Sequence, residues 1–323
     1  MTIQQLKYIV ALNEYRHFAR AADYCMVTQP GLTIQLKNLE EEIGIKIFDR
    51  TKVPLSPTEA GTEIIERAKK LLREADAIRD FVVNRKNDLS GEVTLGVIST
   101  LSPYLIPLFI KAVKELLPHM RFKIAESNTG QLLHDLETGA IDIALMATPA
   151  GNGRLREFHV FMEPFMAYLH EGHALTANEF YEMQPHDRAE ILLLESEFCY
   201  NAQLLDICGL KSPNLGIQYS FDIRSIETLK NMVRAGLGFA LVPQLSVAHE
   251  PENTLCKPFA APMPVREISL VVADTFNRKL LLEKMSEAIW GCLPDSVRQQ
   301  SAYRKVTWND SPYFINAVSQ YIK

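Results

Sequence analysis

The chain has 323 residues, of which 47% are hydrophobic and 23% charged, a composition typical of folded globular proteins and unlike that of disordered or fibrous chains. This length predicts two or three domains. No run of about 18 apolar residues occurs, and Met1–Gln5 lack the features of a signal peptide, so we expect a protein that is neither membrane-spanning nor secreted. Five cysteines, an odd number, favour free thiols in the cytoplasm over a disulfide framework.

The net charge of −5 hides a division along the chain. Residues 1–90 hold 14 Lys and Arg against 13 Asp and Glu, whereas residues 91–323 hold 20 against 26. Neither part is strongly basic. Binding of an anionic partner such as DNA would therefore depend on where individual charges lie and not on bulk charge.

The first residues predict three helices. Apolar residues recur at helical spacing over Leu6–Ala11, and Phe18–Tyr24 forms a second short amphipathic stretch. A third helix has Thr28 as N-cap, Pro30 in its first turn and Gly44 as C-cap. Two short helices joined by a tight turn predict a helix-turn-helix whose second helix enters the major groove. The candidate DNA-binding residues are Thr28, Gln29, Pro30, Thr33, Lys37, Arg50 and Thr51.

Two further features follow the third helix. Ile47–Thr58 is short, β-prone and cationic, and it predicts a wing for phosphate contact. An uninterrupted helix is then expected from Thr58 to about Asn87, roughly 45 Å long. A helix of this length needs a partner to cover its apolar stripe, so we expect a dimer. The stripe residues are Ile64, Ala68, Leu71, Ala75 and Ile78.

The rest of the chain alternates apolar strands with helical segments, which predicts an α/β fold with buried sheets. Two small doubly wound subdomains with a cleft between them fit this density of strands. The expected helices include 105–117 and 226–235. The expected strands are 93–98, 122–125, 141–146, 167–169, 191–194, 217–221, 239–242 and 268–272.

These elements divide the chain into four parts. We expect a winged helix-turn-helix domain over 1–58, a linker and dimerisation helix over 59–90, and a regulatory domain over 91–293. The regulatory domain would comprise one subdomain of 91–164 plus 269–293 and a second of 165–268. The tail 294–323 is polar with scattered aromatic residues, and the sequence assigns it no role.

Several motifs in the chain resemble those of the LysR-type transcriptional regulators. They are Phe18-Ala19-Arg20-Ala21-Ala22, Thr28-Gln29-Pro30, Leu36-Lys37-Asn38-Leu39-Glu40, Phe48-Asp49-Arg50, Leu55-Ser56-Pro57-Thr58-Glu59-Ala60-Gly61, Glu227-Thr228-Leu229-Lys230-Asn231-Met232-Val233 and Gly236-Leu237-Gly238. The resemblance covers residues 1 to about 293. It implies a cytoplasmic transcription regulator that binds a dyad-symmetric DNA site as a dimer or tetramer and acts with RNA polymerase.

A second resemblance is to the peroxide-sensing members of that family. Cys199 and Cys208 are spaced like their peroxidatic and resolving cysteines, which form a reversible disulfide. The resemblance implies a regulator that senses hydrogen peroxide, activates oxidative-stress genes, is reset by a cellular thiol reductant, and needs no cofactor or metal. The matching peroxide-pocket positions are Thr100, Thr129, Arg266 and Phe198, of which Phe198 departs from the family, where His is typical.

The spacing of the two cysteines gives the disulfide a physical consequence. If one helix runs from Cys199 to Cys208, capped by Ser196 and ended by Gly209, the two residues lie about 13 Å apart on opposite faces. Disulfide Cα atoms lie within about 7 Å, so oxidation would have to melt the helix. The helix N-terminus, and a cation if Arg266 is near, would favour the Cys199 thiolate, whose sulfenic acid would then condense with the Cys208 thiol.

Two other function classes remain open at this point. One is a regulator of the same fold that binds a small metabolite in the cleft, with Thr100 and Thr129 as ligand contacts. The other is an enzyme, a thiol peroxidase that uses the same cysteines. The sequence otherwise favours no enzyme, because it has no assembled metal spacing, no nucleophile elbow and only a fragment of a dinucleotide fingerprint. Cys25, Cys256 and Cys292 are interpreted as small apolar groups.

Overall fold

The structure is a computed structural model that describes most of the chain in two compact units. One unit comprises Met1–Lys86 with Thr275–Asn277, and the other Asn87–Asp274 with Arg278–Lys323. The described residues are 1–85, 89–149, 155–184, 190–194, 198–209, 225–248, 250, 255–298 and 302–307.

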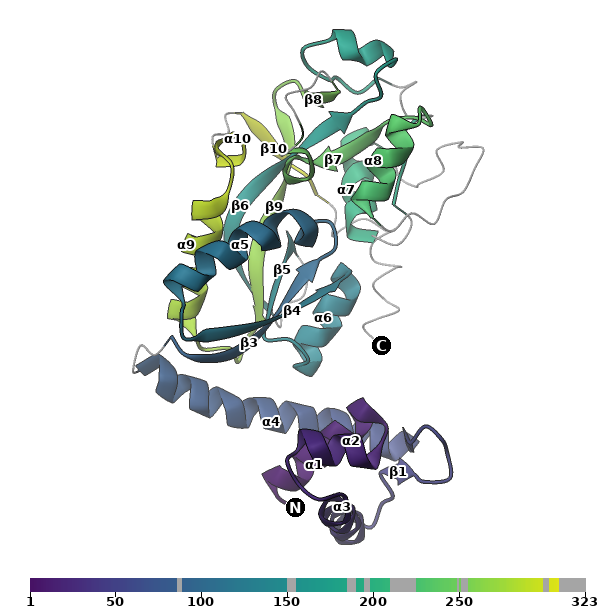
Figure 1. Cartoon of the computed structure of the whole chain (residues 1–323), viewed down its shortest axis with the longest axis vertical. Helices are drawn as coiled ribbons and strands as arrows, with labels where there is room; N and C mark the ends of the chain where they lie inside the picture. Colours follow the sequence, from purple (N-terminus) through teal and green to yellow (C-terminus); the bar gives the residue numbers. More distant parts are fainter. Residues whose placement is uncertain are drawn as a thin grey trace. The chain divides into compact units, whose positions relative to one another are not determined.

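The first unit is a winged helix-turn-helix followed by a long helix (Figure 1). The Thr28 hydroxyl caps the third helix by accepting from the Gly31 N–H at 3.3 Å, and Gly44 ends it with φ 71°. These predicted boundaries are confirmed. The elements are α1 (Ile3–Tyr15), α2 (Phe18–Tyr24), α3 (Gln29–Ile43), β1 (Phe48–Asp49), β2 (Ser56–Pro57) and α4 (Glu59–Arg85).

A buried carboxylate attaches the wing to α3. Glu40 has an exposed fraction of 2%, and its Oε1 accepts hydrogen bonds from the backbone N–H groups of Ile47 at 2.8 Å and Phe48 at 3.3 Å. At the start of α4, Gly61 lies so close to this segment that a Cβ would collide with the Ile47 carbonyl oxygen. The wing is therefore fixed from both sides, by a side chain of α3 and by a close backbone approach of α4.

The second unit is α/β with a mixed sheet (Figure 1). Strands run in the order β4-β3-β5-β9-β6-β7. β3 pairs in parallel with β4 and with β5, whereas the β5–β9, β9–β6 and β6–β7 pairs are antiparallel. The strands are β3 (Gly91–Ile98), β4 (Met120–Ser127), β5 (Ile143–Thr148), β6 (Leu155–Tyr168), β7 (Ala240–Pro243), β8 (Cys256–Pro258), β9 (Met263–Ala273) and β10 (Tyr303–Lys305). The helices are α5 (Ser102–Leu116), α6 (Thr129–Thr138), α7 (Phe198–Cys208), α8 (Ile226–Arg234), α9 (Lys279–Cys292) and α10 (Asp295–Arg298), with short 3-10 turns η1 (Ala174–Ala177) and η3 (Gln244–Val247).

Most predicted strands are confirmed, and the differences concern pairing. The strand expected over 167–169 is the end of the 14-residue β6, which pairs antiparallel with the 11-residue β9. Among the described residues, the strand expected over 191–194 is reduced to one bridge between Ile191 and Phe239, in which the Leu192 N–H donates to the Phe239 carbonyl and the Phe239 N–H to the Glu190 carbonyl. The strand expected over 217–221 lies outside the described residues.

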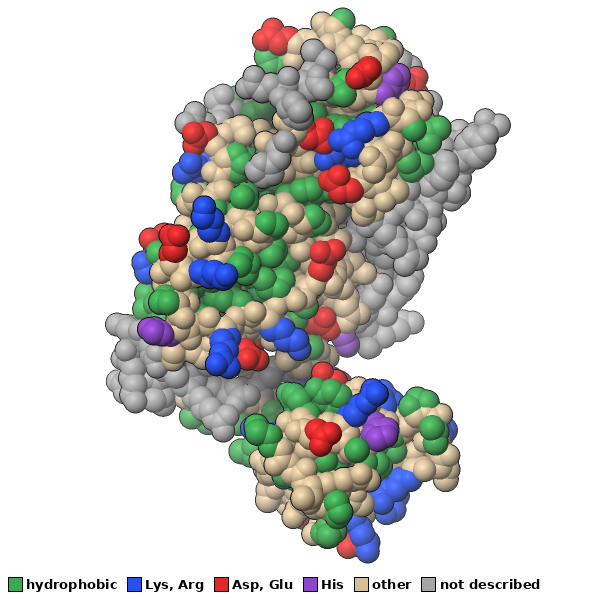
Figure 2. Space-filling view, in the orientation of Figure 1, with side chains coloured by type: hydrophobic (Ala, Val, Ile, Leu, Met, Phe, Trp, Pro, Cys, Tyr) green, Lys and Arg blue, Asp and Glu red, His purple; other side chains and the backbone are tan. Residues whose placement is uncertain are grey.

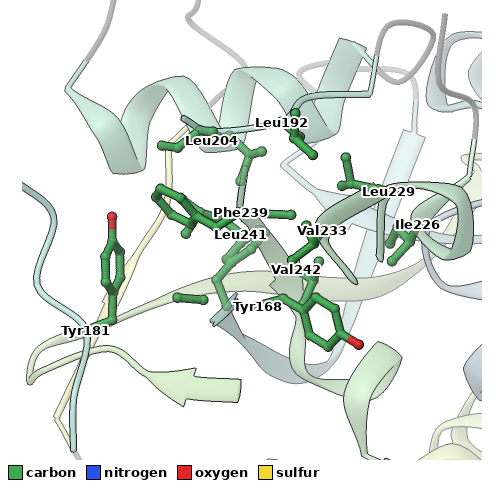
Figure 3. Close-up of a cluster of buried hydrophobic side chains, with 14 of the residues drawn as sticks. Tyr168, Tyr181, Leu192, Leu204, Ile226, Leu229, Val233, Phe239, Leu241 and Val242 are labelled. Atoms are coloured by element: carbon green, nitrogen blue, oxygen red, sulfur yellow. The ribbon is translucent and has the colours of Figure 1, made fainter. Parts of the chain in front are cut away.

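The helices α7 and α8 share one buried apolar cluster with β6 and β7. Figure 3 shows Leu204 of α7 and Val233 of α8 directed into the same cluster as Phe239, Leu241 and other labelled side chains. Cys208, at the end of α7, belongs to this cluster and has an exposed fraction of 4%. The second predicted cysteine is therefore part of the hydrophobic core. Among the described helices, none is long and apolar enough to cross a lipid bilayer.

The apolar stripe of α4 divides into two parts. Ala68 is buried in the core of the first unit, and Ile64 packs against that core. Further along, Leu71 and Ile78 are exposed at 42% and 69%, with the half-buried Ala75 between them. Contact of large apolar side chains with water is unfavourable, and burying them stabilises a protein or a complex. We propose that Leu71 and Ile78 pack against a second copy of the chain.

We expect the double substitution Leu71→Glu and Ile78→Glu to dissociate or weaken the dimer, because it places carboxylates in an apolar contact. Sedimentation velocity measures the change. The matched control is Arg67→Gln with Lys70→Gln, which alters the net charge equally at two exposed positions of the same helix. An unchanged oligomer in the glutamate variant would show that these two residues do not form the contact.

Candidate functional site

The DNA-binding candidates lie on the first half of α3 and at the start of the wing. Gln29 and Pro30 are exposed in the first turn of α3, whereas the Thr28 hydroxyl is engaged as the cap. Thr33 donates from its hydroxyl to the Gln29 carbonyl at 2.9 Å. Lys37 is exposed and pairs with Glu41 at 3.4 Å. The exposed face of α3 thus presents the Gln29 amide in its first turn and the Lys37 ammonium about two turns further on.

The two wing candidates are both held by neighbouring carboxylates. Arg50 lies 3.3 Å from the buried Glu40 carboxylate and 5.8 Å from the centre of the Phe18 ring. The Thr51 hydroxyl donates to Asp49 at 2.6 Å, and this bond lowers the pKa of Asp49. Figure 2 shows positive and negative side chains interspersed over the drawn face of this unit. This mixture of charges agrees with the nearly balanced composition of residues 1–90.

The two candidate redox residues lie on one helix. α7 runs from Phe198 to Cys208, and Gly209 follows with φ 63°, so the predicted helix end is confirmed. The predicted cap Ser196 and the side chains of Phe198 and Cys199 lie outside what the structure describes. Nine residues of helix place the ends about 13 Å apart, well beyond the roughly 7 Å that a disulfide permits.

A buried ion pair brings together two of the predicted pocket residues. Arg266 of β9, 1% exposed, contacts the fully buried Glu163 of β6 at 2.7 Å. Its NH1 also donates to the Thr100 hydroxyl at 2.9 Å, and its NH2 to the Thr100 carbonyl at 3.3 Å. The other Glu163 oxygen accepts from the Leu245 N–H at 3.0 Å. The guanidinium therefore links β6, β9 and the loop before α5.

Tyr200 connects this pair to the start of α7. Its ring packs against Phe165 at 6.3 Å between centroids, and Phe165 lies on the same face of β6 as Glu163. Burial raises the pKa of the Tyr200 phenol, with opposing contributions from the nearby Arg266 and Glu163 charges. The phenol donates to the Leu241 carbonyl. Tyr200, the residue after Cys199, thus packs on the strand segment that carries Glu163, the partner of Arg266.

Thr129 lies at the same edge of the sheet as Thr100. The parallel strands β3 and β4 end together, with Ile98 opposite Ser127, and each threonine follows its strand by two residues. Both side chains are 4% exposed. Among the described contacts, Arg266 bonds directly to Thr100. Thr129 lies at the same edge of the sheet as Thr100, but no contact among the described residues joins it to Arg266.

Glu163 is the site residue that sequence reasoning missed. The signal was a single carboxylate in the apolar run Phe161-Met162-Glu163-Pro164-Phe165. A charge buried in such a strand requires a cationic partner. The sequence alone did not indicate which cation this would be, because Arg266 is 103 residues away.

A second buried polar network joins α5 to α8. Lys230, 3% exposed, contacts Glu250 at 2.6 Å and Glu227 at 3.0 Å and donates to the Ser246 carbonyl at 2.8 Å. The Tyr104 phenol of α5 donates to Glu227 at 2.8 Å. These bonds satisfy the buried ammonium and connect the helix after Thr100 to α8.

The other described cysteines lie in surroundings that disfavour thiolate. Burial raises the pKa of Cys256 to about 11, and nearby Glu250 adds to the rise. Burial also raises the pKa of Cys25 and Cys292. Because the thiolate is the nucleophile, these three thiols are poorly suited to reaction with an oxidant.

Comparison with known proteins identifies families for both units. Residues 3–62 match the family described as "Bacterial regulatory helix-turn-helix protein, lysR family", and residues 86–289 match "LysR substrate binding domain". The chain is 33% identical over 294 residues to the "Hydrogen peroxide-inducible genes activator" of Haemophilus influenzae, covering 90% of this chain and 96% of that one. It is also 33% identical over 291 residues to the "DNA-binding transcriptional dual regulator OxyR" of Escherichia coli, covering 90% and 95%.

Solved structures give the same family over most of the chain. A full-length OxyR variant from Pseudomonas aeruginosa matches with a TM-score of 0.76 and 32% identity over 91% of this chain and 99% of that one. An H2O2-bound OxyR mutant from Corynebacterium glutamicum matches with a TM-score of 0.62 and 28% identity over 92% and 94%. The helix-turn-helix, the two-subdomain α/β unit and these matches agree: the chain belongs to the LysR family of bacterial regulatory helix-turn-helix proteins.

Proposed function

We propose that this chain is a transcription activator of oxidative-stress genes that senses hydrogen peroxide through Cys199 and Cys208. One structural observation carries the proposal: the two cysteines occupy the two ends of α7, and Tyr200 in its first turn packs on Phe165, two residues after the Glu163 that pairs with Arg266. The names of its relatives, several of them hydrogen peroxide-inducible gene activators, support the same reading. The chain would work in the cytoplasm, bound to a dyad-symmetric DNA site and in contact with RNA polymerase.

The proposed chemistry has two steps that balance. The Cys199 thiolate attacks one oxygen of hydrogen peroxide, so that an S–O bond forms, the O–O bond breaks and hydroxide leaves. The Cys208 sulfur then attacks the Cys199 sulfenic acid, so that the S–S bond forms and water leaves. A cellular dithiol would return both residues to thiols.

Two features of the site support Cys199 as the thiol that reacts first. It lies in the first turn of α7, where the helix dipole favours an anion. The Arg266 charge acts on the adjacent Tyr200, where Glu163 opposes it with a smaller effect, and the remaining positive potential would favour a thiolate at Cys199. Cys208 is instead buried among apolar side chains at the other end of α7, where neither effect favours a thiolate.

The disulfide would convert oxidation into a change of conformation. Its formation requires α7 to unwind, since the helix holds the two residues about 13 Å apart. Cys208 must also leave the cluster shown in Figure 3, to which Leu204 of the same helix belongs. The reduced and oxidised proteins would therefore differ in the packing of the second subdomain, which is the signal passed to DNA.

The two alternatives have less support from the described contacts. A metabolite held by Thr100 and Thr129 would have to share the Thr100 hydroxyl with Arg266, which already donates to it at 2.9 Å. A thiol peroxidase would leave the helix-turn-helix without a purpose. The domain boundaries stay as proposed from the sequence, with a regulatory domain of 91–164 plus 269–293 and 165–268.

We expect Gln29→Ala to reduce discrimination between the specific site and random DNA by about 1–3 kcal/mol, because the amide can pair with a base edge. Lys37→Ala should instead weaken both kinds of DNA alike and reduce the salt slope by about 1, as for a phosphate contact. Fluorescence anisotropy at several salt concentrations measures both. Lys279→Ala, which removes another exposed lysine paired with a glutamate at i+4, Glu283 of α9, is the control. Equal loss on both DNAs for Gln29→Ala would refute its role.

Cys199→Ser should abolish the response to peroxide, whereas Cys208→Ser should still form a sulfenic acid at residue 199. Mass spectrometry after peroxide and a sulfenate-trapping reagent distinguishes the two. Cys256→Ser is the control, since a thiol of pKa about 11 should not contribute. Trapping at Cys208 in the Cys199→Ser protein at a comparable rate would reverse the assigned roles.

Glu163 should act as a positioning residue that partly neutralises Arg266. In Glu163→Gln the Arg266 charge is uncompensated, so the pKa of Cys199 should fall and its reaction with peroxide should extend to lower pH; Arg266→Met should shift the profile the other way. Each shift should be on the order of 1 pH unit. Glu250→Gln, which also removes a carboxylate from a buried pair, should alter stability without moving the profile. A profile unmoved in Glu163→Gln and Arg266→Met would exclude this role.

A further inference from the structure

The segment Tyr303–Thr307 forms ordered contacts, although it lies beyond residue 289, where the family match ends. Within it, β10 pairs in parallel with the start of β9, with Lys305 opposite Val265. The Met263 N–H donates to the Ala302 carbonyl at 3.1 Å, and the Val306 N–H donates to the Val265 carbonyl at 2.9 Å. The tail is therefore attached to β9 at the residue that precedes Arg266.

The same segment also contacts α7 through one aspartate. Arg304 NH1 donates to Asp206 Oδ2 at 2.8 Å, and the Thr307 hydroxyl donates to Asp206 Oδ1 at 3.3 Å. Both carboxylate oxygens of Asp206 are thus bound by the tail. Asp206 lies two residues before Cys208, in the last turn of α7.

An apolar contact accompanies these polar ones. Val306 is 1% exposed and belongs to the buried cluster that contains Cys208 and Leu204 of α7. Burial of a valine side chain stabilises the packed arrangement more than an exposed ion pair does. The tail therefore holds the end of α7 by a buried side chain as well as by Asp206.

We propose that Tyr303–Thr307 is a clasp on the redox helix, which sets how readily α7 opens and thereby how fast Cys208 reaches the oxidised Cys199. This inference rests on the proposed function. Asp206 lies between the two cysteines, so unwinding of α7 must displace it from Arg304 and Thr307. The free energy of the clasp contacts adds to that of opening α7, and the rate of disulfide formation follows the population of the open form.

The clasp acts on the second chemical step alone. In that step the Cys208 sulfur forms the S–S bond, the S–O bond of the Cys199 sulfenic acid breaks, and water leaves. The first step, in which peroxide oxidises Cys199, requires no opening of the end of α7. Loosening the clasp should therefore accelerate disulfide formation and leave sulfenic acid formation unchanged.

Hydrogen exchange of the reduced full-length protein tests the clasp directly. Arg304→Ala should speed exchange of the amides in the last turns of α7 by about two- to fivefold, the effect of one exposed ion pair. Val306→Ala, which removes buried methyl groups, should speed it about tenfold. Arg298→Ala is the matched control, because Arg298 forms an arginine–aspartate pair of similar length, 2.6 Å, with Asp295 within α10. The charge exchange Asp206→Arg with Arg304→Asp should restore slow exchange.

Kinetics of the two chemical steps complete the test. After rapid mixing with peroxide, disulfide formation should be faster in Arg304→Ala by the same factor as exchange. In the Cys208→Ser background, sulfenic acid formation at Cys199 should be equally fast with and without Arg304→Ala. If Val306→Ala fails to fold, Thr307→Val, which removes only one hydroxyl contact, gives the second measurement.

The outcomes separate the clasp from the proposed function. Absence of a Cys199–Cys208 disulfide in the unmodified protein would overturn the proposed function, while hydrogen exchange would still show whether the tail holds α7. A disulfide that forms at the same rate in Arg304→Ala and Arg298→Ala, with equal exchange in α7, would overturn the clasp and leave the proposed function standing.

Discussion

The Arg266–Glu163 ion pair is the contact on which the arrangement of the second unit depends. The two residues lie directly opposite one another in the β6–β9 ladder, so a shift of one residue in the register would send one of them to the other face of the sheet. A buried ion pair is stable only when its remaining hydrogen bonds are satisfied. Here Thr100 and the Leu245 N–H satisfy them, and the pair therefore fixes the loop before α5 and the η3 turn relative to the two long strands.

The ion pair also determines what surrounds the first turn of α7. Phe165, two residues after Glu163, packs on Tyr200, and this contact holds the first turn of α7 over the face of β6 that carries the ion pair. The far end of α7 is held by different means, through Cys208 in the apolar cluster and Asp206 on the tail. The two ends of α7 are thus held by different contacts. In the proposed function, a disulfide between these ends conflicts with the helix itself, and this conflict would let α7 act as a switch.

The DNA-binding unit uses a buried carboxylate in a comparable way. Glu40 accepts two backbone N–H bonds at the start of the wing and lies within 3.4 Å of both Lys46 and Arg50. The sequence predicts Arg50 as a phosphate contact, and the structure adds that Glu40 restricts where its guanidinium can lie. With 41% of its side chain exposed, Arg50 is oriented by the protein and still accessible from solvent.

Local signals along the chain were sufficient to predict several of the elements. Thr28, Pro30 and Gly44 set the ends of α3 through cap chemistry, and the spacing of apolar residues predicted α2, α4 and α8. Motif order along the chain indicated the family, which the comparisons confirm. The pairings between distant residues follow from the folded arrangement instead: Glu163 with Arg266, Glu40 with the wing, and Arg304 with Asp206. No local rule predicts these contacts, because strand register and burial bring the partners together. The local sequence around a buried carboxylate indicates that it needs a partner but does not identify that partner.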